Sequence, residues 1–145
     1  MAGMEDHQGR YQIGEVAGRV GLSPRTVRYY GEVGLVAPSG RTQGGFRLYT
    51  DDDIARLLLI KQLKPLDFTL EELRDLLDTR SRLGDPATDP ARHGELLERL
   101  AGYARVAEQR CTQLREQLAA VEAVTRTLQR EARMHRSRAS SPERR

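Results

Sequence analysis

The longest regular pattern in this sequence is a heptad repeat over residues 95–133, a segment with no proline and a single glycine, Gly102. Nine of the ten a and d positions are apolar. The a positions hold Leu97, Ala104, Cys111, Leu118 and Thr125, and the d positions hold Leu100, Ala107, Leu114, Val121 and Leu128. Because such a repeat presents an apolar seam to another helix, it predicts one long helix that pairs in a coiled coil.

The sizes of the seam residues favour an antiparallel homodimer. In a parallel pair, Ala104, Ala107 and Cys111 would meet their own copies and form three thin layers in succession. An antiparallel register instead sets small residues against large ones, pairing Leu97 with Leu128, Leu100 with Thr125, Ala104 with Val121, Ala107 with Leu118, and Cys111 with Leu114. In this register the two Cys111 residues lie beyond the roughly 7 Å Cα separation that a disulfide allows, so we expect a packed, inert thiol.

The N-terminal third predicts two short helices joined by a turn that contains glycine. Apolar residues at 13, 16, 17 and 20 share one helical face, and Gly21 ends that helix. Ser23 is a good N-cap and Pro24 suits the first position of a second helix, which runs to about Val33 before Gly34. This arrangement is typical of a helix-turn-helix.

A hairpin and two further helices are predicted next. Gly44 and Gly45 favour a tight two-residue turn with positive φ at both positions, followed by a strand over residues 46–49 that forms a wing. Thr50 caps a third helix that ends near residue 63, before Pro65. Thr69 opens a fourth helix, which reaches about residue 77.

The predicted fold is therefore mainly α, with a winged helix-turn-helix followed by a long dimerisation helix in an antiparallel coiled coil. We expect a flexible arm over residues 1–10, the winged helix-turn-helix domain over 11–80 and a connector over 81–94. The dimerisation helix then covers 95–133, and a disordered basic tail covers 134–145 because it contains few apolar residues.

Arginine gathers in the N-terminal domain, where five arginines and one acidic residue lie between positions 18 and 49. Such a surface suits an anionic partner, with nucleic acid the first candidate. No run approaches the roughly 18 apolar residues of a membrane helix, and the N-terminus lacks an apolar signal core, so a cytoplasmic protein is expected. Catalytic groupings are absent from the sequence, and the three histidines lack ligand spacing, so neither an enzyme nor a metal or cofactor site is expected.

The segments 13–17, 22–30, 34–36, 44–49 and 67–73, taken in this order, closely resemble the MerR family of bacterial transcription regulators. The resemblance implies a homodimer that bends and untwists double-stranded promoter DNA and so realigns its elements for RNA polymerase holoenzyme. It also implies that the second predicted helix enters the major groove while the wing contacts the backbone. The implied DNA-binding residues are Ser23, Pro24, Arg25, Thr26, Arg28, Tyr29, Arg41, Phe46 and Arg47.

General physics supports these roles, because a helix N-terminus attracts phosphate and arginine can pair bidentately with guanine. For Arg25 and Arg28 the alternative is a solvated helix face, and of the adjacent tyrosines we expect Tyr30 to be the buried one. No effector domain is recognisable, so an effector is either absent or bound between the dimer helix and the DNA-binding domain. The alternative function is an architectural protein whose coiled coil recruits another protein.

Overall fold

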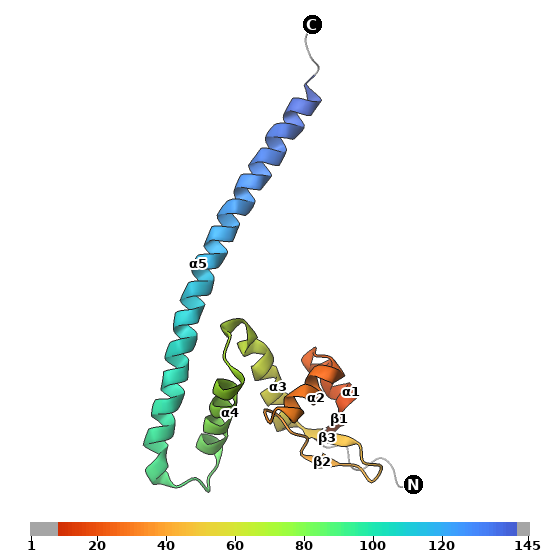
Figure 1. Ribbon diagram of the computed structural model, residues 1–145, viewed down its shortest axis with the longest axis vertical. Coiled ribbons are helices and arrows are strands. Elements are labelled where there is room, and N and C mark those ends of the chain that lie inside the picture. Colours follow the sequence, from red (N-terminus) through yellow and green to blue (C-terminus); the bar gives the residue numbers. More distant parts are fainter. Residues whose placement is uncertain (1–8, 142–145) are drawn as a thin grey trace. The chain divides into compact units, whose positions relative to one another are not determined.

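Glycine and proline set the bounds of the first two helices at the predicted positions (Figure 1). The structure is a computed structural model that describes residues 9–141. Helix α1 covers Ile13–Val20 and is followed by Gly21. The φ of Gly21 is 68°, in the left-handed region that glycine adopts without strain. Helix α2 covers Pro24–Glu32 and is followed by Gly34 with a φ of 78°. The predicted helix-turn-helix is therefore confirmed.

A three-stranded antiparallel sheet lies beside these helices, in the order β1-β3-β2. Strands β2 (Gly40–Arg41) and β3 (Arg47–Thr50) form the predicted wing hairpin. Strand β1 (Arg10–Gln12) was not predicted, and its first residue falls in the segment expected to be a flexible arm. It forms because Arg10 pairs with Thr50 and Gln12 pairs with Leu48. These partners are distant in the sequence, so no local pattern predicts the strand. Residues 1–8 of the expected arm lie outside the described residues.

The wing turn differs from the predicted two-residue turn. Gly45 has a φ of 83°, whereas Gly44 does not lie in the left-handed region. The Gly45 amide donates to the Thr42 carbonyl at 2.9 Å, and the Thr42 amide donates to the Phe46 carbonyl at 2.9 Å. These bonds enclose a three-residue loop with one left-handed glycine, the next most common hairpin connection.

Capping boxes begin the next two helices, as predicted. Helix α3 covers Asp51–Leu63 with Thr50 as its N-cap, and helix α4 covers Leu70–Gly84 with Thr69 as its N-cap. A 3₁₀ turn, η1 (Lys64–Leu66), separates them. Helix α4 continues well past the predicted end near residue 77, because Thr79 is buried in its next turn and Asp78 pairs with Arg82 at 3.1 Å along the same face. The connector is correspondingly shorter than 81–94 and contains a second 3₁₀ turn, η2 (Pro90–Arg92).

The core of the N-terminal unit is drawn from α1, α2, β3, α3 and α4. Its fully buried side chains include Val16, Val20, Val27, Tyr49 and Leu57. Leu73 and Leu77 bring one face of α4 into the same cluster, and Tyr30 packs against it while partly buried. Because α1, α2, α3, α4 and β3 contribute to one core, α2 and the wing are held in fixed positions on it.

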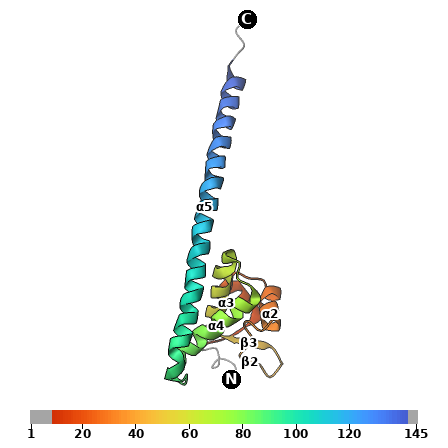
Figure 2. The same ribbon diagram turned by 60° about the vertical axis from the view of Figure 1, so that its left-hand side comes forward.

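The chain divides into two compact units, Met1–Tyr103 and Ala104–Arg145. Helix α5 covers His93–Ser140 and is continuous in the view of Figure 2. Its first eleven residues belong to the first unit, and the remainder belongs to the second. The helix extends beyond the predicted end at residue 133, so residues 134–140 of the expected disordered tail are helical. No glycine or proline occurs there, and Pro142 is the first residue that disfavours a helix. Within the described residues, no helix combines the length and apolarity needed to cross a membrane.

Candidate nucleic-acid interface

Three of the predicted DNA-binding residues, Ser23, Pro24 and Thr26, form the N-terminus of α2. The amide of Thr26 donates to the Ser23 hydroxyl oxygen at 3.1 Å, and the two hydroxyl oxygens lie 2.8 Å apart. Pro24 occupies the first turn, where its missing N–H costs nothing. Ser23, Pro24 and Thr26 therefore fix where the helix begins and how its free amides point.

The outward face of α2 carries the long side chains of the predicted set. Arg25 and Arg28 are exposed. Tyr29 is 46% exposed, and its ring centroid lies 5.8 Å from that of the partly buried Tyr30. Tyr30, which we expected to be the buried one, packs against the core but is only partly buried. Tyr29 therefore packs beside Tyr30 at a tilted angle of 49° and remains partly open to solvent.

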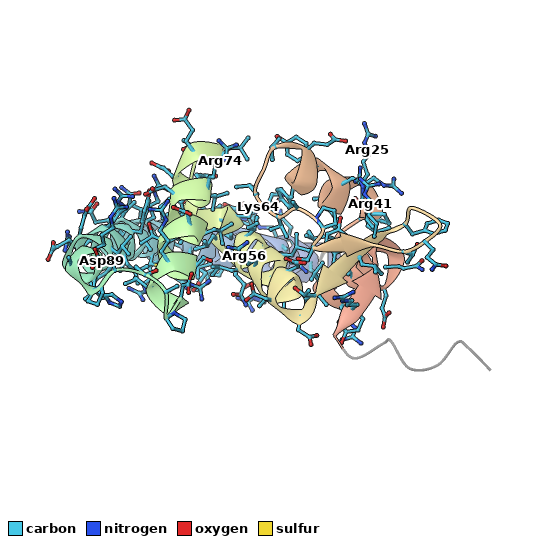
Figure 3. The ribbon with its side chains drawn as sticks, turned by 90° about the horizontal axis from the view of Figure 1, so that it is seen from below. Arg25, Arg41, Arg56, Lys64, Arg74 and Asp89 are labelled. Atoms are coloured by element: carbon cyan, nitrogen blue, oxygen red, sulfur yellow. The ribbon has the colours of Figure 1, made fainter. Side chains whose placement is uncertain are left out.

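The wing presents three further residues of the predicted set. Phe46 is 63% exposed, and its amide donates to the Thr42 hydroxyl oxygen at 3.1 Å. Arg41 is exposed, and its Nη1 donates to the Gly45 carbonyl at 3.3 Å across the wing loop. Arg47 is partly buried in β3. Figure 3 shows Arg41 on the same side of the domain as Arg25 of α2.

The buried hydroxyl of Tyr49 is influenced by charged side chains of both α2 and the wing. Burial raises its pKa above the ordinary value, and the charges of Arg47 and then Arg28 lower it. Both guanidinium groups therefore lie within electrostatic reach of one buried hydroxyl, which makes no geometrically good hydrogen bond within the described residues. Arg28 comes from α2 and Arg47 from β3, so the helix and the wing each bring a guanidinium group near this hydroxyl.

The base of the wing is held by Asp53, a buried carboxylate in the first turn of α3. It accepts the Ser39 hydroxyl at 2.6 Å and the Thr50 amide at 2.9 Å. Ser39 precedes β2 and Thr50 ends β3, so one side chain ties both ends of the hairpin to α3. The capping box was predicted, but the bond to Ser39 was not, because fourteen residues separate the pair.

Two basic residues that the sequence analysis did not single out hold the C-terminal ends of the helix-turn-helix. Lys61 of α3 donates to the Val20 carbonyl at the end of α1 at 2.9 Å. Arg74 of α4 donates to the Val33 carbonyl at the end of α2. Each bond spans 41 residues, so no local signal could have revealed it. Both cations also interact favourably with the negative end of a helix dipole.

Helix α5 carries the predicted seam. The described residues Leu97, Leu114, Leu118, Val121 and Leu128 are 38–62% exposed in the single chain. Leu100, Ala107 and Cys111 are partly exposed, and Ala104 is exposed. The described part of the chain contains no group of three His, Cys, Asp or Glu side chains that could hold a metal ion.

An exposed basic helix beside a basic wing, both built on one core, defines a DNA-binding protein of the winged helix-turn-helix class. A family profile described as MerR HTH family regulatory protein matches residues 11–80. The HTH-type transcriptional regulator ZntR of Escherichia coli (strain K12) is 34% identical over 120 residues, which cover 83% of this chain and 77% of ZntR. The chain belongs to the MerR family of DNA-binding transcription regulators, which is not a family of enzymes.

Other relatives differ in length. Nodulation protein NolA of Bradyrhizobium sp. (strain NC92) is 38% identical over 109 residues, which cover 75% of this chain but only 42% of NolA. Among solved structures, HiNmlR, described as a MerR family regulator lacking the sensor domain and bound to promoter DNA, has a TM-score of 0.65. It is 23% identical and covers 87% of this chain and 95% of its own, so it is similar in fold. A MerR family regulator from Bacillus cereus has a TM-score of 0.54 at 26% identity, covering 94% of this chain and 87% of its own.

Proposed function

We propose that this protein is a sequence-specific regulator that binds double-stranded promoter DNA as a homodimer, with α2 in the major groove. The observation that carries the proposal is the exposed face of α2, where Arg25, Arg28 and Tyr29 stand beside the basic wing. A helix of this kind fits the major groove, and arginine is the commonest reader of guanine there. HiNmlR, which has the same fold, is described as bound to promoter DNA.

Within this proposal the predicted residues divide by role. Arg25 and Arg28 read bases, and Tyr29 reaches a phosphate from the same helix. Ser23, Pro24 and Thr26 present the helix N-terminus, where free amides and the dipole favour negative charge. Arg41, Phe46 and Arg47 bring the wing to the backbone, where contacts set register without reading sequence.

The homodimer forms through α5 in the antiparallel register. The exposed leucines and valine of the seam support this, because large apolar side chains at a and d positions are stabilised by burial against a second helix. In that register the two Cys111 residues are offset by three positions, or about 4.5 Å along the axis, on helices about 8–10 Å apart. Mild oxidation should therefore leave the dimer uncrosslinked; efficient crosslinking through Cys111 would contradict the register.

The homodimer bends and untwists the promoter so that RNA polymerase holoenzyme can engage it. Such a deformation costs several kcal/mol and is offset by the contacts of two DNA-binding domains and two wings. Helix α5 accounts for nearly everything after residue 92, so the proposal includes no effector-binding domain within these 145 residues. A bacterial regulator of this kind acts in the cytoplasm.

The test is the ratio of affinities for specific and random DNA. A duplex is first selected from a random-sequence library by the wild-type chain, and its Kd is then measured by fluorescence anisotropy beside that of a scrambled duplex of equal length. A regulator should prefer the selected duplex by at least about a thousandfold at physiological salt. A ratio near one would contradict the proposal and favour the architectural alternative.

A further inference from the structure

The C-terminal ends of α1 and α2 are stabilised in the same way. Each helix is followed by a glycine with positive φ, Gly21 or Gly34, and a cation from a later helix donates to the last carbonyl. A Cβ on Gly34 would lie 3.8 Å from Nε and Nη2 of Arg74, so the guanidinium group lies directly over this glycine. The C-terminal end of α2 is therefore fastened to α4 by Arg74.

The next residue of α4, Asp75, connects α4 to the start of α5. Asp75 accepts the Tyr103 hydroxyl at 2.6 Å and Nη1 of Arg99 at 3.1 Å. Both partners lie in the first three turns of α5, within the same compact unit. The Tyr103 ring also meets Phe68 edge to face, with centroids 6.0 Å apart. Adjacent residues of one helix thus hold α2 through Arg74 and the start of α5 through Asp75.

We propose that Arg74 is a positioning residue for DNA binding, and that with Asp75 it makes α4 the polar link between α2 and the first turns of α5. The inference rests on the proposed function, since it concerns how α2 is held for the groove. Arg74 acts through the Val33 carbonyl: without it, the end of α2 gains freedom, and the fraction of protein competent to bind DNA falls. A shift in the start of α5 reaches α2 through the same two residues.

The first experiment measures the Kd of the full chain for the selected and scrambled duplexes at several salt concentrations. Arg74→Met removes the donor and keeps the apolar stem, and Arg74→Lys keeps a donor and the charge. Arg80→Met is the matched control, because Arg80 is exposed on the same helix and has no hydrogen bond or ion pair within the described residues.

Arg74→Met should weaken binding to the selected duplex about three- to tenfold, the usual worth of one hydrogen bond, without changing the salt slope. Arg74→Lys should recover part of this loss, and Arg80→Met should leave the Kd within about twofold, as expected for an exposed charge. Three results would overturn the proposal: an unchanged Kd for Arg74→Met, no recovery in Arg74→Lys, or a salt slope lowered by about one on both duplexes. The last would mean that Arg74 contacts a phosphate directly.

The second experiment tests the link to α5 with a double-mutant cycle. Tyr103→Phe keeps the ring against Phe68 but removes the hydroxyl that Asp75 accepts. It should weaken selected-duplex binding about two- to threefold in the wild-type background and have no further effect beside Arg74→Met. Additive losses would overturn the link through α4. If the wild-type chain binds the selected and scrambled duplexes equally, the proposed function itself fails. If the wild-type chain prefers the selected duplex but Arg74→Met binds it as tightly as Arg80→Met does, only this inference fails.

Discussion

Truncating one seam side chain of α5 tests the proposed dimer quantitatively. Leu118 is 57% exposed in the single chain. Complete burial of a leucine contributes about 1.5–3 kcal/mol, so covering the exposed part contributes about 0.9–1.7 kcal/mol for each copy. Because the dimer contains two copies, Leu118→Ala should cost about 1.8–3.4 kcal/mol, which is about 20- to 300-fold in the dimer Kd.

Sedimentation equilibrium measures this shift directly, with Met134→Ala as the control. Met134 is 58% exposed on the same helix but lies outside the a and d positions when the heptad is continued. Its truncation should leave the dimer Kd within about threefold, as for other surface substitutions. Equal effects of the two substitutions, or a wild-type Kd for Leu118→Ala, would refute the seam.

Three further predictions concern single side chains. Arg28→Ala should weaken binding to the selected duplex by about 1–3 kcal/mol and relax the preference at one base position, as read by competition with single-base variants; an unchanged preference would contradict base reading. Arg47→Ala should weaken selected and scrambled duplexes alike and lower the salt slope by about one, and a loss confined to the selected duplex would contradict a phosphate contact. Burial and the hydrogen bond to Asp75 raise the pKa of Tyr103 from 10.0 to about 12. Since the unfolded chain loses this proton first, stability should fall as the pH rises from about 10 to about 12, and Tyr103→Phe should reduce that fall in denaturant titrations; an unchanged fall would contradict it.

Helix boundaries that depend on local chemistry could be predicted from the sequence. Gly21 and the pair Ser23 and Pro24 fixed both ends of the helix-turn-helix turn, because a left-handed residue and an N-cap act within one turn of chain. The same holds for the capping boxes at Thr50 and Thr69. These signals describe the backbone that presents the DNA-binding residues.

Features that depend on distant partners could not be predicted. Strand β1 has only three residues and forms because β3 is beside it. The hydrogen bonds of Lys61 and Arg74 to the ends of α1 and α2 join residues far apart in the sequence. The position of a basic residue on a helix does not indicate which distant carbonyl will accept its hydrogen bond. The later ends of α4 and α5 were missed because exposed polar helix has no apolar periodicity.

In the proposed complex, two copies of this chain place two α2 helices in successive major grooves of one DNA site. Hydroxyl-radical footprinting of the selected duplex tests it most directly. We predict two protected segments of related, inverted sequence, with centres about 10 base pairs or a multiple of that apart, and loss of both together in Leu118→Ala at concentrations below its dimer Kd. A single protected segment, or uniform protection that does not depend on sequence, would contradict this arrangement of the dimer on DNA.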